Sequence, residues 1–416
     1  MARRAGRDRR GILLPLLRLG SASLARRELV TSNSSERLRV LGVDPERDFS
    51  GGESQVLGLT LELIRAGHQA ELLCDPRGLL RRRAGEAGVI CHPLRIRNAI
   101  DLRAGLELRA FLNRRSDDVI HFHTARAHAL APFAGGPPRR AGDRVLIVTR
   151  RMYYVPNRLF APWLYNRAVD AVAAISAGVA RALERAGVAP ERIALIHSGV
   201  DCERFRPASE AQRAAARAAL GVGAGEIAFG TVGALEERKG HRVLLEALAA
   251  LAQGGVAFRC FIAGGGSQRE PLAAQIRALG LEDRVILTGG VEDPCQLLSA
   301  LDVFVFPSLK EGLGVALMEA MACAIAPVAS STGGIPELVE HGRSGLLVSP
   351  ASAIELARAL EGLIAAPALR REMGAAARAR MVDGFSMTAM AARTIELYRA
   401  CLDRARAARR GKRCAA

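Results

Sequence analysis

Two long stretches of the chain alternate short apolar runs with segments of helical periodicity. In the first stretch, the strand-like runs are 38–44, 70–75, 89–94, 118–124, 145–150 and 171–176. In the second stretch, they are 227–235, 258–265, 285–290, 303–308, 326–331 and 345–350. Strands that alternate with helices form βαβ units, whose parallel sheets are covered by helices on both faces. The pattern therefore predicts an α/β protein with two doubly wound, Rossmann-like domains facing a central cleft.

A polar stretch rich in Arg and Ala separates the two patterns. We expect an N-terminal Rossmann-like domain at 38–203, a linker with a short helix at 204–225 and a C-terminal Rossmann-like domain at 226–382. A further helix at 383–408 is expected to pack back on the N-terminal domain. In open α/β sheets, ligands bind at the carboxyl ends of the strands, so we expect the site in the cleft between the domains.

The net charge of +17 is concentrated at the two ends of the chain. Residues 1–37 hold nine Arg and three acidic residues, and residues 399–416 hold seven Lys or Arg and one acidic residue. Basic ends suit an anionic membrane surface, although a solvated charge run is the alternative. We expect 1–37 to be a disordered basic extension and 409–416 a basic tail. No nucleic-acid-binding module is recognisable, so no nucleic-acid partner is expected.

Eight cysteines are scattered without C-x-x-C spacing, which argues against a zinc module or a disulfide framework and fits a reducing compartment. The apolar segment 11–20 is too short to span a membrane and is interrupted by Pro15 and Arg18. A signal peptide is the alternative for this segment. We expect a cytoplasmic protein, peripheral on the inner face of the cytoplasmic membrane.

Gly51 and Gly52 follow the first predicted strand and precede a predicted helix at 54–66. Glycine lets the backbone approach a ligand closely, and a helix N-terminus favours an anion. This predicts a phosphate-contacting loop, with an ordinary Gly-Gly turn as the alternative. The sequence there lacks both G-x-G-x-x-G and a Walker pattern, which excludes dinucleotide and P-loop sites.

A lysine stands at the corresponding junction of the second domain. The chain has 59 basic residues but only three lysines, Lys239, Lys310 and Lys412. Lys239 and its neighbour Arg238 precede a predicted helix. A compact ammonium beside a helix N-terminus suits a diphosphate, whereas a solvated cap residue is the alternative.

Two carboxylates, Glu311 and Glu319, are separated by seven residues in EGLGVALME. Glu311 lies in a loop with Gly312 and Gly314, which free the loop to offer backbone N–H groups. Glu319 lies inside the following helix among apolar neighbours. Because Glu is almost never buried unpaired, Glu319 needs a partner, which ribose hydroxyls would supply.

With the run GGIPELVEHGRSGLLV at 333–348, these motifs resemble the retaining nucleotide-sugar glycosyltransferases of the GT-B fold, the group 1 or family 4 class. The resemblance covers roughly residues 38–405. It implies transfer of a sugar from a nucleotide-diphosphate sugar to a glycan or lipid-linked acceptor with retention of configuration, without a metal or another cofactor. With the basic ends, it favours cell-envelope polysaccharide or lipopolysaccharide biosynthesis.

The resemblance also implies roles for single residues. Glu311 would contact the transferred sugar, Glu319 the ribose and Lys239 the diphosphate. His123 would lie near the donor sugar and the acceptor, whereas we expect His121 to point to the other face and to belong to the core. The implied catalytic residues are Glu311, His123 and Lys239, and the implied donor-binding residues are Gly51, Gly52, Arg238, Lys239, Gly312, Leu313, Gly314 and Glu319.

Two positions depart from the family pattern. Ala234 stands where the family often has Arg, which weakens the diphosphate site unless an arginine at 238, 150 or 151 substitutes. After the Glu319 helix, the family's Gly is replaced by Ala324 and its Pro is displaced to Pro327. We expect this second change to alter packing near the site.

The segment 149–170 holds three of the four tyrosines, the only Trp and four arginines. Rings and arginines suit sugar stacking and anionic groups. We therefore predict an acceptor site with Arg150, Arg151, Tyr153 and Tyr154, whereas a surface helix that packs its aromatics inward is the alternative. Two other functions fit the fold: a nucleotide-sugar 2-epimerase and a non-catalytic sugar-nucleotide-binding scaffold.

Overall fold

The computed structural model describes residues 36–98, 101–135, 144–291 and 293–414. Within these ranges the chain forms two parallel β-sheets with helices around each, so the predicted pair of doubly wound domains is confirmed. The basic extension expected at 1–37 lies, except for its last two residues, outside the described residues. In the described part of the chain, no helix is long and apolar enough to cross a membrane.

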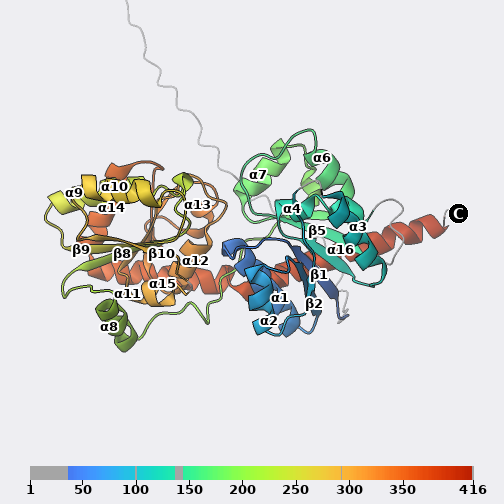
Figure 1. The fold of residues 1–416 in the computed structure, drawn as a ribbon, viewed down its shortest axis with the longest axis horizontal. Coiled ribbons are helices and arrows are strands. Elements are labelled where there is room, and N and C mark those ends of the chain that lie inside the picture. The colour runs from blue at the N-terminus through green and yellow to red at the C-terminus, as the bar shows by residue number, and fades with distance from the viewer. Residues whose placement is uncertain (1–35, 99–100, 136–143, 292, 415–416) are drawn as a thin grey trace, which may run out of the picture. The chain divides into compact units, whose positions relative to one another are not determined.

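The first sheet has seven strands in the order β3-β2-β1-β4-β5-β6-β7 and is coloured from blue to green in Figure 1. Its strands are β1 (Arg39–Asp44), β2 (Gln69–Cys74), β3 (Cys91–Pro93), β4 (Val119–Phe122), β5 (Val145–Arg150), β6 (Ala171–Ala174) and β7 (Ile193–Leu195). Its helices are α1 (Gly51–Arg65), α2 (Leu79–Glu86), α3 (Leu102–Asn113), α4 (Ala125–His128), α5 (Ala131–Ala134), α6 (Ala161–Trp163) and α7 (Ala177–Arg185). The strand order reverses direction between β1 and β4, which makes their carboxyl ends a natural ligand site.

The second sheet has six strands in the order β10-β9-β8-β11-β12-β13. Its strands are β8 (Ile227–Val232), β9 (Phe258–Ala263), β10 (Val285–Gly289), β11 (Val303–Phe306), β12 (Ala326–Ser330) and β13 (Leu346–Val348). Its helices are α9 (His241–Gln253), α10 (Arg269–Ala278), α11 (Cys295–Ala300), α12 (Val315–Ala322), α13 (Ile335–Leu338), α14 (Ala353–Ala365) and α15 (Pro367–Gly384). Here the switch point lies between β8 and β11, beside the loops that carry Lys239 and Glu311.

Helix α1 begins with a capping box. Ser50 Oγ accepts a hydrogen bond from the N–H of Gly52 at 3.2 Å, and Glu53 Oε2 accepts one from the N–H of Ser50 at 2.7 Å. The box fixes the start of the helix at Gly51, three residues before the predicted start. The two glycines expected in a loop therefore form the first turn of the helix.

The linker expected at 204–225 contains α8 (Glu210–Ala219), which packs against α11. Two of its arginines hold the carboxylate of Asp302, with distances of 2.7 Å from Arg213 and 2.9 Å from Arg217. Asp302 also accepts a hydrogen bond from the backbone N–H of Ala228 at 2.9 Å. These contacts attach the linker helix to the second sheet.

The chain ends in α16 (Met387–Cys414), which packs against α1 and β5 of the first sheet (Figure 1). Tyr398 on this helix is fully buried. The sequence predicts that the helix ends at 408 and that 409–416 is a tail. That boundary is wrong, because the helix continues to Cys414 through a run of Arg and Lys residues of high helix propensity, which is interrupted only by Gly411.

Candidate active site

The N-termini of two helices meet at the site. α1 begins at Gly51 and α12 at Val315, and a Cβ atom on Gly51 would lie 3.2 Å from the Cβ of Val315. The cap of α12 is Gly314, which has a φ of 111° and provides no side-chain hydrogen bond. Helix N-termini carry unsatisfied N–H groups and a partial positive charge. Two of them together form a suitable environment for phosphate oxygens.

The carboxylate of Glu311 pairs with the ammonium of Lys239. Lys239 Nζ donates to Glu311 Oε2 at 2.5 Å, and only 13% and 12% of the two side chains is exposed. Ser308 Oγ donates to the same oxygen at 3.3 Å, and the ammonium lies 5.1 Å from the centre of the Phe306 ring. Because the pair is sheltered from water, an incoming anion must compete with Glu311 for the ammonium.

Glu319 lies in the second turn of α12, beside the buried residues Met318 and Ala320. Within the described residues its carboxylate accepts no hydrogen bond. Burial raises its pKa from 4.5 to about 7, an effect that Arg204 opposes and Asp293 increases. The site therefore contains a sheltered carboxylate that is able to accept hydrogen bonds from a ligand.

His121 and His123 lie on the same face of the first sheet. Their ring centres are 4.0 Å apart, so the expectation that His121 points away is wrong, since side chains two residues apart in a strand share a face. His121 contacts Tyr398 Oη at 2.6 Å and Thr149 Oγ1 at 2.7 Å, as expected of a core residue. His123 is 4% exposed, and its Nδ1 has no partner among the described residues. Burial holds the pKa of His123 well below its ordinary value, so the ring is neutral.

Asp44, at the carboxyl end of β1, is a site residue that the sequence reasoning missed. It is 1% exposed; its Oδ1 accepts from the N–H of Glu46 at 3.0 Å, whereas Oδ2 has no partner among the described residues. Burial and then nearby Glu53 raise its pKa to about 7. Arg151 lies close by, and a Cβ on Gly52 would be 3.9 Å from its Cδ. The sequence does contain a signal for this residue, because Asp44 is an acidic residue at the end of the first predicted strand.

Arg151 is sheltered beside these acids. Burial lowers its pKa to about 10, which Asp44 and Glu53 partly oppose. Its Nη1 donates weakly to Ser198 Oγ at 3.5 Å, and its Nε has no partner among the described residues. The positive charge of Arg151 therefore lies at the N-terminus of α1.

The four predicted acceptor residues do not gather in one place. Successive residues of an extended strand point to opposite faces, and Arg150 lies on the face opposite Arg151. The Arg150 guanidinium is 4.7 Å from the ring centre of Tyr154 and donates to its carbonyl oxygen at 3.4 Å. Tyr153 is half-buried against the core. Arg150 and Tyr154 thus form one group, Tyr153 packs on the core, and Arg151 belongs to the group at α1.

Three further residues predicted to bind the donor, Gly312, Leu313 and Arg238, have different surroundings. Gly312 allows close approach of the Glu311 loop to the first sheet, because a Cβ there would lie 2.4 Å from the carbonyl oxygen of Arg151. The side chain of Leu313 is buried in the core. The Arg238 side chain turns to Glu236, at 2.6 Å, and is 42% exposed. In this state Arg238 is therefore not joined to the Lys239 pair.

The segment after α12 departs from the family pattern at Ala324. Its φ is 59°, a left-handed conformation that favours glycine. Its N–H donates to the carbonyl of Met321 at 3.0 Å, and the N–H of Ile325 donates to that of Ala320 at 3.1 Å. These two hydrogen bonds form a Schellman motif, which is the usual helix ending with glycine at this position. The helix therefore ends in the usual way, but Ala324 adopts the left-handed conformation with more strain than a glycine would have.

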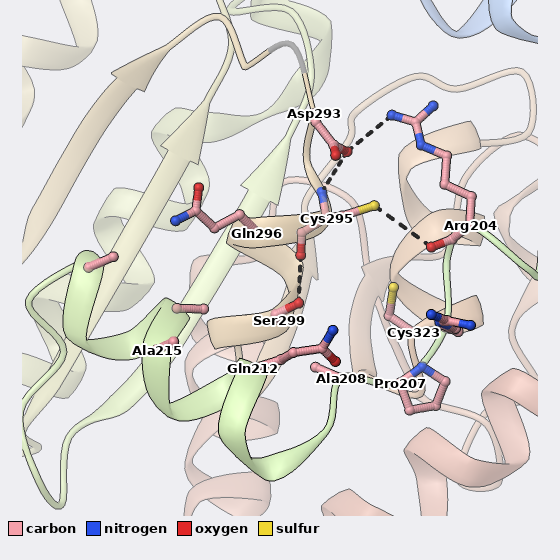
Figure 2. A pocket seen from close by; sticks show the side chains of 13 residues that line it. Arg204, Pro207, Ala208, Gln212, Ala215, Asp293, Cys295, Gln296, Ser299 and Cys323 are labelled. Carbon is pink, nitrogen blue, oxygen red and sulfur yellow. Dashed lines mark hydrogen bonds and ion pairs between the residues drawn. The ribbon is translucent and has the colours of Figure 1, made fainter.

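A cavity of about 690 Å³ lies beside α12, between the linker, α8 and α11 (Figure 2). Figure 2 shows Asp293 between Arg204 and Cys295; its Oδ1 accepts from the Arg204 guanidinium and from the N–H of Cys295, each at 3.1 Å. Arg204 and Asp293 both act electrostatically on Glu319. None of the residues predicted from the sequence lines this cavity. Its walls come from segments about ninety residues apart, which no local pattern connects.

Comparisons with known proteins agree with this arrangement. The model described as "Glycosyl transferases group 1" matches residues 212–380, and the model described as "Glycosyltransferase Family 4" matches residues 49–204. The alpha-maltose-1-phosphate synthase of Mycolicibacterium smegmatis is 31% identical over 365 residues, which cover 80% of this chain and 92% of that protein. A D-inositol 3-phosphate glycosyltransferase of Saccharomonospora viridis is 35% identical over 222 residues, 51% of each chain.

Two solved structures share the fold. Anabaena Alr3699/HepE, crystallised with UDP and glucose, has a TM-score of 0.77 and 23% identity over 87% of this chain and 99% of its own. A glycosyltransferase from Rickettsia africae has a TM-score of 0.78 and 19% identity over 88% and 99%. The matches of the two family models to the two halves, and the match that covers 92% of the maltose-1-phosphate synthase, establish the family. This chain therefore belongs to the group 1, family 4 glycosyltransferases and has their two-domain GT-B fold.

Proposed function

We propose that this glycosyltransferase uses a nucleotide-diphosphate sugar and transfers the sugar with retention of anomeric configuration. The observation that carries the proposal is the meeting of two helix N-termini beside a sheltered Lys–Glu pair. The N–H groups of Gly51 and Val315 and the ammonium of Lys239 would neutralise the two phosphates. Arg151 would add the positive charge that Ala234 does not supply.

In the proposed reaction, the bond between the anomeric carbon and the diphosphate oxygen breaks, and the acceptor oxygen bonds to that carbon on the same face. The acceptor proton passes to the leaving phosphate oxygen. Charge grows on the diphosphate in the transition state, so the positive groups fixed around it lower the barrier. Glu311, released from Lys239, would accept hydrogen bonds from the sugar hydroxyls, and Glu319 from the ribose. His123, neutral and with a free Nδ1, would orient the sugar or the acceptor hydroxyl.

The donor and acceptor are proposed by class. The crystals of HepE with UDP and with UDP-glucose support a uridine-diphosphate sugar as the first donor to test. The names of the two curated relatives each contain a phosphorylated compound, which supports an anionic acceptor. We propose an anionic, lipid-linked glycan of the cell envelope, such as a lipopolysaccharide core, reached from the cytoplasmic face of the membrane. The transfer would proceed without a bound metal or other cofactor.

A donor screen tests this proposal. Thermal shifts with UDP, GDP, ADP and CMP sugars would identify the nucleotide, because a ligand stabilises the state that binds it. We expect Lys239→Met to weaken donor binding by at least about tenfold, since charged hydrogen bonds contribute roughly 1.5–3 kcal/mol. Lys310→Met is the matched control, because Lys310 is exposed. Unchanged donor affinity in Lys239→Met, or an inverted product in an NMR assay, would overturn the proposal.

A further inference from the structure

One short segment of the first domain exposes an unusual density of large apolar side chains. Among the described residues, seventeen large apolar side chains are exposed, and six of them lie between positions 152 and 163. They are Met152 (50% exposed), Tyr154 (44%), Val155 (38%), Leu159 (92%), Phe160 (49%) and Trp163 (46%). We call them the 152–163 surface. A cluster of this kind marks an interaction site, whereas scattered exposed residues need no explanation.

Local contacts hold these side chains outward. Asn157 Oδ1 accepts hydrogen bonds from the backbone N–H groups of Leu159 at 2.8 Å and Phe160 at 3.3 Å. The rings of Phe160 and Trp163 lie 5.3 Å apart, and Leu164, the next residue, is buried in the core. The segment is therefore attached to the domain on one side and presents its apolar side chains on the other.

Exposed arginines accompany the 152–163 surface. From residue 144 to residue 169 the sequence contains arginines but no Asp or Glu, and Arg158 and Arg167 are exposed. Figure 1 shows α6, which ends this surface, at the outer edge of the elements around the first sheet. Trp, Tyr and Phe side chains with nearby arginines are the residues enriched where a protein meets the polar headgroups of a membrane. Because no acid within 144–169 offsets these arginines, the segment is complementary to anionic lipid.

We propose that the 152–163 surface docks the protein on an anionic phospholipid bilayer. Its apolar side chains enter the headgroup region, and Arg158 and Arg167 contact lipid phosphates. This inference rests on the membrane-facing location proposed above, and it identifies the surface that would contact the membrane. The surface begins directly after Arg151, whose carbonyl oxygen faces Gly312 in the Glu311 loop. A lipid-linked acceptor would thus leave the bilayer close to the loop that holds the donor sugar.

The chain contains a reporter within this surface, because Trp163 is its only tryptophan. The full-length protein is mixed with phosphatidylcholine vesicles, with and without phosphatidylglycerol. We expect a blue shift of the Trp163 emission on the anionic vesicles and quenching by lipids with brominated chains. The basic ends contain no tryptophan, so this signal separates docking of the surface from attraction by the ends.

A matched pair of variants tests the apolar contribution. Leu159→Ser with Phe160→Ser is expected to lower affinity for anionic vesicles by about tenfold or more, while Trp163 remains as reporter. Leu102→Ser with Leu106→Ser is the control: it removes two exposed apolar side chains on α3, 64% and 61% exposed, and should change little.

These experiments distinguish docking through the 152–163 surface from membrane binding through other parts of the chain. Sedimentation with anionic vesicles without any change in Trp163 emission would overturn the docking surface and leave the membrane location to the basic ends. No sedimentation at all would overturn both. An emission shift that follows protein concentration without vesicles would show that a second copy of the chain occupies the surface, and would also overturn the proposal.

Discussion

Replacing Glu319 by Gln is expected to stabilise the ligand-free protein above neutral pH. The pKa of Glu319 is raised by burial from 4.5 to about 7, so the folded protein keeps this proton at pH values where the unfolded chain has lost it. The contribution of the protonated carboxyl to the unfolding free energy is fully present below pH 4.5 and is lost as the pH rises through about 7. The difference corresponds to roughly 3 kcal/mol of unfolding free energy, since one pKa unit equals about 1.4 kcal/mol.

Urea unfolding followed by circular dichroism at about pH 5 and about pH 8 measures this effect. The Gln variant should gain under about 1 kcal/mol at the lower pH and up to about 3 kcal/mol at the higher pH. Glu361→Gln is the control, because Glu361 is exposed on α14. If Glu319→Gln is no more stable than the unmodified chain at the higher pH, the carboxylate has a partner in solution and the reasoning is refuted. In the same variant, donor affinity should fall by about tenfold, because the proposed contact with the ribose hydroxyls would lose its charged acceptor.

The other predictions concern catalysis, metal, strain and the ends of the chain. Glu311→Ala should lower turnover more than donor affinity, which steady-state kinetics with donor titration would show; an equal loss in both would contradict its place at the sugar. Activity should persist in excess EDTA if, as we propose, positive side chains and helix N-termini take the place of a metal; loss restored by manganese would refute this. Ala324→Gly should raise the unfolding free energy by up to about 1 kcal/mol in urea unfolding, by relieving the left-handed alanine. Removal of 1–37 and 407–416 should weaken binding to anionic vesicles most at low salt; equal binding would assign no role to the ends.

Much of the fold could be predicted because its strands are buried on both faces. Runs such as 145–150 are apolar at every position before Thr149, and the structure starts and ends β5 at the predicted residues. β7 was missed because Ile193–Leu195 is a three-residue edge strand that is only partly buried. The start of α1 could have been predicted, because Ser50 and Glu53 have the spacing of a capping box. The two glycines between them instead suggested a loop.

The site could be predicted only where its residues are adjacent in sequence. Lys239 and Glu311 stand at strand–helix junctions and Glu319 follows inside the next helix, and local patterns locate all three. The alternation of strand side chains also predicts that Arg150 and Arg151 diverge. By contrast, the pairing of Arg204 with Asp293 joins the linker to the segment before α11, and only the packing of α8 on α11 brings them together.

The charged groups of the site divide into those that already have a partner and those that do not. Lys239 and Glu311 satisfy each other, whereas Asp44 and Glu319 are sheltered carboxylates, and neither has a charged partner as close as that pair. A sheltered carboxylate oxygen without a hydrogen-bond donor destabilises the folded chain, and a ligand with hydroxyl groups removes that cost when it binds. A diphosphate that takes the ammonium of Lys239 would simultaneously free the carboxylate of Glu311 for the sugar. Binding of the two halves of the proposed donor would therefore be coupled through one ion pair, so a nucleoside diphosphate without its sugar should leave the Glu311 carboxylate without a charged partner and bind less tightly than the complete donor.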